Sequence, residues 1–211
     1  SPPSTPGRRQ SLADLQLHSC AGAEDDRCEF DTALGRLEVD PSFVGTLKNV
    51  LAAQPESFGW LLDQAALDLE DGLRQLSVLV GAGVVGVGVF SGAGAEASGP
   101  SIAAFNQRCL DQITTGEEIG ALLSPVLLQP VPITLLEAFF LQVAQADLVP
   151  EDMAQLVWMG MGMAGATVKD PDGRPIEDPE QAMAQLRQFG ETFARERLPV
   201  LRRLGIGPAA P

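Results

Sequence analysis

Gly81, Gly83 and Gly86 have the spacing GxGxxG. In dinucleotide-binding folds this spacing brings the backbone close to a pyrophosphate at the N-terminus of a helix. That chemistry requires a strand before the glycines and a helix after them. Here the apolar run LSVLV continues a long helical pattern, and a second glycine-rich stretch follows the motif. No alternation of strands and helices surrounds it, so a nucleotide-binding enzyme is the least favoured hypothesis.

His18, Cys20 and Cys28 are the residues best suited to bind a metal ion, because imidazole and thiolate are zinc ligands. Their spacing is wider than the Cys-x₂₋₄-Cys of structural zinc sites, and no second pair of ligands follows. Cys20 and Cys28 could instead close a disulfide loop in an oxidising compartment, although thiols are the commoner arrangement. Cys109 has only His18 as a candidate base, which does not support nucleophilic catalysis. We expect no catalytic residue, no metal and no cofactor.

Two pairs of neighbouring acids, Glu117–Glu118 and Glu151–Asp152, could supply carboxylates for general acid–base catalysis. Both pairs lie in the first turn of a predicted helix, where the helix dipole favours negative charge, so a structural role is preferred. Residues 170–173 begin like a calcium-binding loop, but Arg174 occupies a ligand position and the closing glutamate is missing. We interpret this segment as a proline-stiffened turn.

The composition excludes one large class of function. The 211 residues include 28 acids and 14 bases, which gives a net charge of −14. A nucleic-acid-binding protein normally presents a basic face, so no nucleic-acid partner is expected. A content of 45% hydrophobic residues is enough to build a folded core. One histidine and no tyrosine leave few side chains for proton transfer.

Helix signals dominate the sequence. N-cap residues followed by proline, and threonines followed three residues later by glutamate, mark helix starts. These signals predict helices that begin at Pro41, Pro55, Gly116, Leu135, Pro150 and Pro179. Two segments rich in glycine or proline, 92–100 and 169–179, are expected to be loops. Period-two alternation is absent outside one glycine–valine segment, so the predicted fold class is mainly α.

The glycine–valine segment, residues 75–95, carries no charge over 21 positions. A helix needs about 20 residues to span a bilayer. We therefore expect one long Gly/Val-rich apolar helix, which is a candidate for a transmembrane helix. Small residues recur in it at intervals of four, a spacing that lets two membrane helices pack closely; they are Ser77, Gly81, Ala82, Gly86, Gly88 and Gly92. The alternative is a buried element of a soluble protein, either a helix end or a short valine-rich strand.

Met159, Met161 and Met163 alternate with glycines in a run that would make a soft, adaptable apolar surface. Such a surface suits contact with a partner or a cofactor, but packing of a helix end in the core is the preferred interpretation. The C-terminal helix is locally basic, and a solvated face is preferred there over docking to an acidic partner or to anionic lipid. Its arginines are Arg187, Arg195, Arg197, Arg202 and Arg203.

The sequence predicts three parts: a Pro/Ser-rich and acidic N-terminal arm at 1–39, a helical pair at 40–95 and a helical region at 96–211. Side chains suited to catalysis are scarce, and two surfaces are suited to close contact: the small-residue face of the glycine–valine segment and the methionine run. These features indicate a non-enzymatic helical subunit of a larger, membrane-associated complex, whose partners are other protein subunits. The alternative is a soluble helical protein-binding module. Localisation is not determined; membrane association is favoured, and the start at Ser1 is consistent with a processed organellar or exported protein.

Overall fold

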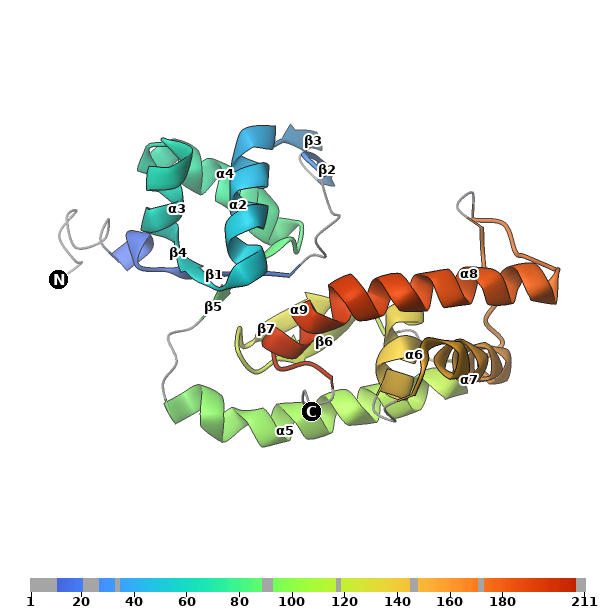
Figure 1. Cartoon of the computed structure of the whole chain (residues 1–211). Helices are drawn as coiled ribbons and strands as arrows, with labels where there is room; N and C mark the ends of the chain where they lie inside the picture. The colour runs from blue at the N-terminus through green and yellow to red at the C-terminus, as the bar shows by residue number, and fades with distance from the viewer. Residues whose placement is uncertain are drawn as a thin grey trace. The chain divides into compact units, whose positions relative to one another are not determined.

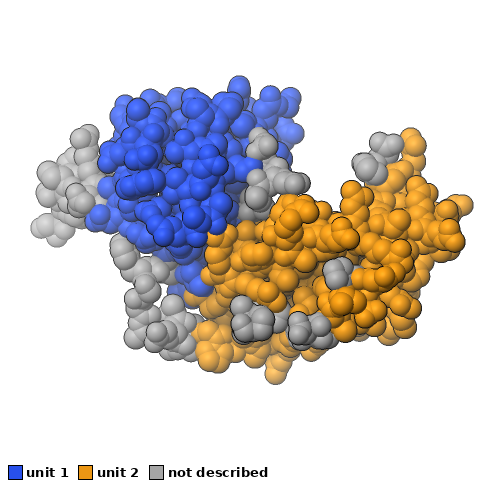
Figure 2. Space-filling model, viewed as in Figure 1, with its two compact units in different colours: residues 1–92, 126–128 blue, residues 93–125, 129–211 orange. Residues whose placement is uncertain are grey.

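The computed structural model describes residues 11–20, 27–32, 35–88, 93–116, 119–144, 148–170 and 173–207. Figure 1 labels their helices and strands. The chain divides into two compact units, coloured separately in Figure 2: unit 1 is Ser1–Gly92 with Val126–Leu128, and unit 2 is Ala93–Pro125 with Gln129–Pro211. Among the described residues, the structure is 60% helical with 16% strand in three small sheets. The predicted mainly α fold with one long apolar helix is therefore wrong.

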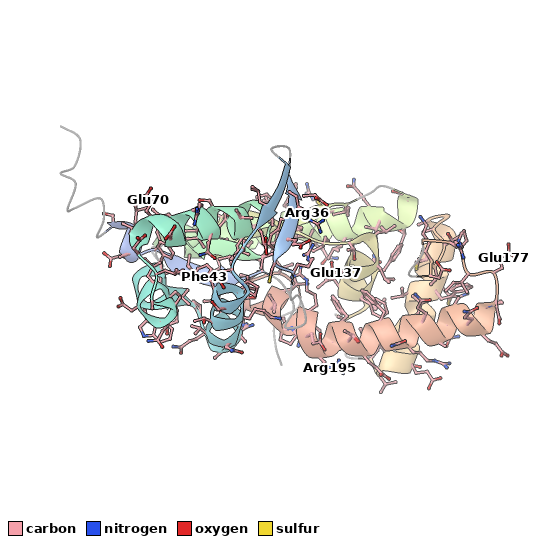
Figure 3. All side chains as sticks on the ribbon, turned by 90° about the horizontal axis from the view of Figure 1, so that it is seen from above. Arg36, Phe43, Glu70, Glu137, Glu177 and Arg195 are labelled. Atoms are coloured by element: carbon pink, nitrogen blue, oxygen red, sulfur yellow. The ribbon has the colours of Figure 1, made fainter. Side chains whose placement is uncertain are left out.

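The described residues of unit 1 include a short helical turn at 11–13, longer helices, a three-stranded antiparallel sheet and a hairpin. The longer helices are α2 (Pro41–Ala53), α3 (Phe58–Ala65) and α4 (Leu69–Gly81). The sheet has the order β4 (Glu56–Ser57), β1 (Gln16–Ser19) and β5 (Val85–Gly88). The hairpin pairs β2 (Glu29–Thr32) with β3 (Gly35–Glu38), and Figure 3 labels Arg36 on it. The core between these elements includes Leu17, Phe43, Phe58, Leu61 and Leu79.

Helix α2 begins as the sequence predicts. The carboxylate of Asp40 accepts a hydrogen bond from the backbone N–H of Ser42, and Pro41 occupies the first turn. Hydrogen bonds from Ser42 hold the pKa of Asp40 below its usual value, chiefly the bond from the Ser42 hydroxyl. The helix predicted from Pro55 begins instead at Phe58, after the strand at Glu56–Ser57. It is also divided in two, because Ala66 takes a left-handed conformation with a φ of 53° and Asp68 caps the next helix.

The glycine–valine segment is the largest departure from the prediction. Helix α4 ends at Gly81, and Gly83 adopts a φ of +72°, where a left-handed residue closes the helix end. The N–H of Val84 donates to the carbonyl of Leu79, which completes the terminating turn. The chain then forms strand β5, which pairs with β1. Within the part of the chain that the structure describes, no helix combines the length and the apolar character needed to cross a bilayer.

Two valines and one glycine suit β5 to its place beside β1. The β-branched residues Val85 and Val87 favour extended backbone, and Val87 stands opposite Leu17 in the ladder. A Cβ atom at Gly88 would lie 2.5 Å from Nε2 of His18, so the absence of a side chain there makes room for the imidazole. The described residues 75–88 of this segment are therefore the C-terminal part of α4 and the short strand β5, and the strand is the alternative that the sequence left open.

Unit 2 contains the remaining helices and a second hairpin. Helix α5 (Ala93–Gln112) continues into the short 3₁₀ helix η1 (Ile113–Thr115). The hairpin pairs β6 (Ala121–Ser124) with β7 (Gln129–Pro132). Four more helical segments are α6 (Leu135–Val143), α7 (Pro150–Met163), α8 (Pro179–Thr192) and α9 (Leu198–Arg203), with a π-helical turn η3 (Phe193–Arg197) between the last two. Pro199 has no N–H to donate to a regular helix, and the wider turn precedes it.

The expected loop at 92–100 is also wrong, because residues from Ala93 onward belong to α5. The second expected loop, 169–179, contains only an isolated bridge between Lys169 and Pro175 among its described residues before α8 begins. The predicted helix starts at Leu135, Pro150 and Pro179 are confirmed. The helix predicted from Gly116 is wrong, because a 3₁₀ turn ends there and strand β6 begins at Ala121. Glu117 and Glu118 lie outside the described residues.

Candidate interaction surface

Helix α7 is built from a sequence with one buried and one exposed apolar face. Pro150 occupies its first turn, and Glu151 and Asp152 place negative charge where the N-terminal end of the dipole favours it. The inner face is buried and consists of Met153, Ala154, Val157 and Met161. Gly160 also faces the core, because a Cβ atom there would lie 3.1 Å from Cε1 of Phe139. The glycine–methionine run is thus partly explained by close packing of α7 on α6.

The outer face of α7 is apolar and exposed. Leu156, Met159 and Met163 are 42%, 58% and 75% exposed. They are spaced by three and four residues, which places them on one side of a helix. Val149, the residue just before the helix, is 60% exposed and continues the same spacing seven residues before Leu156. We call Val149, Leu156, Met159 and Met163 the α7 stripe.

Asp152 occupies the remaining position of this pattern, three residues after Val149 and four before Leu156. Its side chain is exposed, and among the described residues it makes no ion pair. Its neighbour Glu151 pairs with Arg187 of α8 at 2.9 Å between Oε1 and Nη2, and both side chains of this pair are largely exposed. The surface therefore joins a row of apolar side chains to one carboxylate at the N-terminal end of the helix.

The predicted small-residue positions do not share one helix face. Ser77 is exposed on α4, where its hydroxyl donates to the carbonyl of Leu73. Gly81 and Ala82 are exposed at the end of that helix. Gly86 and Gly88 are buried in strand β5, and Gly92 lies outside the described residues. Of the predicted methionines, Met159 and Met163 belong to the α7 stripe, whereas Met161 is 6% exposed and belongs to the core.

The GxGxxG run has the reverse of the geometry that a dinucleotide requires. Gly81 ends a helix and Gly86 lies in a strand, whereas the binding motif follows a strand and opens a helix. The C-terminal end of a helix dipole carries partial negative charge, which repels a phosphate. These residues therefore offer no support for nucleotide binding.

The residues considered for metal binding or catalysis do not come together in a site. Within the described residues, no group of three His, Cys, Asp or Glu side chains is placed to hold a metal ion. Cys20, Cys28 and Cys109 are present as thiols, and Sγ of Cys20 lies 4.0 Å from the carbonyl oxygen of His18. Residues 171 and 172 of the expected proline-stiffened turn lie outside the described residues.

Three of the five arginines predicted near the C-terminus, Arg187, Arg195 and Arg197, take part in ion pairs. Arg197 donates from Nε to Oε1 of Glu137 at 2.8 Å and from Nη2 to the carbonyl of Pro132. The same carboxylate accepts the N–H of Thr134, and the Thr134 hydroxyl accepts the N–H of Glu137, so the predicted capping box is confirmed. Figure 3 labels Glu137 and also Arg195, which pairs with Glu196. The positive charge of these three arginines is therefore balanced by neighbouring carboxylates.

Unit 2 has a pocket of about 240 Å³. Its polar side chains include Asn106, whose amide donates to the carbonyl of Leu123 and accepts its N–H, as a neighbouring strand would. A second, Gln107, donates to Asp111. Both amides therefore already make hydrogen bonds within the protein and give no sign of a ligand.

The chain matches no known protein family, no curated protein and no solved structure. The candidate site consequently depends on the geometry of α7. The sequence pointed to its methionines but missed Val149, Asp152 and Leu156. Their spacing of three and four residues after a helix-starting proline was the signal that could have found them.

Proposed function

We propose that this chain is a non-enzymatic helical subunit that binds a partner protein, and that the α7 stripe is the contact surface. The observation that carries the proposal is the row of four large apolar side chains that are between 42% and 75% exposed. Single exposed apolar residues are normal on a protein surface, whereas apolar residues aligned on one helix face are typical of a contact with another protein.

The energy available at this surface is consistent with a specific contact. Fully burying one such side chain contributes about 1.5–3 kcal/mol. Because these four side chains are still 42% to 75% exposed, covering them would contribute about 1–2 kcal/mol per residue, and roughly 4–7 kcal/mol in all. Methionine adapts its shape to the partner, which favours contact with an irregular apolar surface.

The experiment compares two double variants of the full chain. Met159→Glu/Met163→Glu places two carboxylates in the α7 stripe, and Ala184→Glu/Gln188→Glu adds the same two charges, at the same spacing of four residues, on α8. All four residues are exposed, so each substitution is expected to change the free energy of unfolding by no more than about 0.5 kcal/mol.

A photo-crosslinking amino acid at position 159 identifies the neighbouring protein in the cells from which the chain comes, and that protein is then purified for binding measurements. We expect the stripe variant to weaken the dissociation constant by at least about tenfold, while the α8 variant leaves it within about twofold. Equal affinity of the purified partner for both variants, with both chains folded, would contradict the proposal.

A further inference from the structure

We propose that the occupant of the α7 stripe is an amphipathic helix of the partner, with arginine or lysine beside its apolar residues at the end that meets Asp152. This inference rests on the proposed function, and it names the chemistry of the partner. Two observations lead to it: the spacing of the exposed residues and the charge of the helix that carries them.

The spacing of the surface matches a helical partner. Positions 149, 152, 156, 159 and 163 follow one another at alternating intervals of three and four residues. This is the repeat by which one helix receives the side chains of another that lies along it. From position 149 to position 163 the row is about 21 Å long at the rise of an α-helix, enough for three turns or more of a partner helix.

The charge of the surface determines which helix fits. Helix α7, with the sequence PEDMAQLVWMGMGM, contains two acids and no base. A partner helix that covers the stripe also covers Asp152, whose carboxylate loses water in the contact and then needs a cation. A guanidinium group meets that requirement best, because it can donate two parallel hydrogen bonds to one carboxylate.

A second copy of this chain does not meet the requirement. A parallel pair of α7 helices would bring Asp152 close to Asp152 of the other copy. An antiparallel pair would place it opposite an apolar residue of the stripe, which offers no cation. Two chains of net charge −14 also repel each other.

The test uses a displayed library of helical peptides as the probe. Leucine is fixed at the a and d positions, and the flanking e and g positions are randomised among arginine, glutamine and glutamate. The library is selected on the full chain, and peptides that also bind the Met159→Glu/Met163→Glu variant are removed. We expect arginine at one end of the selected peptides, with affinity about tenfold higher than that of the same peptides carrying glutamate.

Charge reversal at Asp152 then tests the assigned contact. Asp152→Lys is expected to reverse the preference from arginine to glutamate, whereas Glu191→Lys, the corresponding charge reversal at an exposed position of α8, is expected to leave it unaltered. Stripe-dependent peptides without a charge preference, or with a preference that Asp152→Lys does not reverse, would overturn the inference and leave the proposed function standing.

Three further outcomes bear on the inference and on the proposed function. If every peptide that binds the full chain also binds the stripe variant equally well, so that none remains after the removal step, the stripe is not the contact surface, and the proposed function falls as well. If no peptide is selected, and the full chain instead binds vesicles of phosphatidylcholine and phosphatidylserine through the stripe, the occupant is a lipid surface and the inference is overturned. Selection of no peptide without vesicle binding also overturns it.

Discussion

Gly190 of α8 lies against the buried ring of Phe140, and replacing it with alanine tests how closely the two helices α6 and α8 pack. A Cβ atom at Gly190 would lie 2.7 Å from Cε1 of Phe140, whereas ordinary contact begins at 3.4 Å. The Phe140 ring is fully buried, and its centroid lies 5.4 Å from that of Phe189 and 5.8 Å from that of Phe193. The ring therefore cannot move away without disturbing both neighbours.

Two opposing effects set the size of the change. Extra volume in a well-packed core costs about 1–3 kcal/mol, whereas alanine in place of glycine inside a helix contributes about 0.5–1 kcal/mol of stability. We expect Gly190→Ala to lower the free energy of unfolding by about 1–2 kcal/mol. Gly162 of α7 is the matched control, because nothing lies within 4 Å of a Cβ atom there. Gly162→Ala is expected to raise the free energy of unfolding by about 0.5 kcal/mol.

Urea unfolding followed by circular dichroism measures both variants on the transition of unit 2, to which both glycines belong. The double variant Gly190→Ala/Phe140→Leu completes a double-mutant cycle. Because leucine occupies less space beside Gly190 than phenylalanine does, the double variant should lose less free energy of unfolding than the two single variants lose together. If Gly190→Ala is as stable as Gly162→Ala, the packing argument is refuted and the ring moves freely.

The remaining predictions concern two carboxylates. Glu137→Ala removes both the capping-box acceptor and the partner of Arg197. Because the side chains of Glu137 and Arg197 are only 14% and 15% exposed, the substitution is expected to lower the free energy of unfolding by about 2–4 kcal/mol. Asp71→Ala, which breaks the exposed pair with Arg74, should change it by no more than about 0.5 kcal/mol in the same urea assay, and equal effects would contradict this assignment. The lowered pKa of Asp40 means that its cap stabilises α2 fully above the ordinary value of 3.8 and loses that effect as the pH falls through the lower folded value. The stability difference between the natural chain and Asp40→Ala should therefore shrink below pH 3.8, and a difference that grows there would show the wrong sign.

Local signals in the sequence were sufficient for most helix starts. The Asp40 cap, the capping box of Thr134 and Glu137, and the first-turn prolines at 150 and 179 all act within three residues of the helix start. Each of these contacts joins residues that are close in the sequence, so the local sequence is enough to recognise it. These starts were therefore predicted correctly without knowledge of the tertiary structure.

The short strands could not be predicted in the same way. Each strand has only two to four residues, too few to show an alternating pattern. Strand β5 depends on a partner about 70 residues earlier in the chain, since Val87 pairs with Leu17 and Gly88 makes room for His18. The absence of charge from residues 75–95 was correctly recognised, but burial inside a folded unit removes charge as effectively as a bilayer does. The turn at Gly83 distinguishes a buried element from a membrane-spanning helix, because it ends α4 after too few apolar residues to cross a bilayer.

The methionine run shows how much of the candidate site could be predicted from the sequence. Treating Met159, Met161 and Met163 as one surface ignored the geometry of a helix, in which residues two apart point about 200° from each other and residues four apart about 40°. Once Pro150 is accepted as a helix start, Met159 and Met163 must share a face with Leu156, and Met161 must lie on the opposite face. Which face is buried still depends on Phe139, whose ring leaves no room for a side chain at Gly160 and so brings Met161 into the core. The helix period defines the stripe, and the packing of α7 on α6 determines that the stripe is the exposed side.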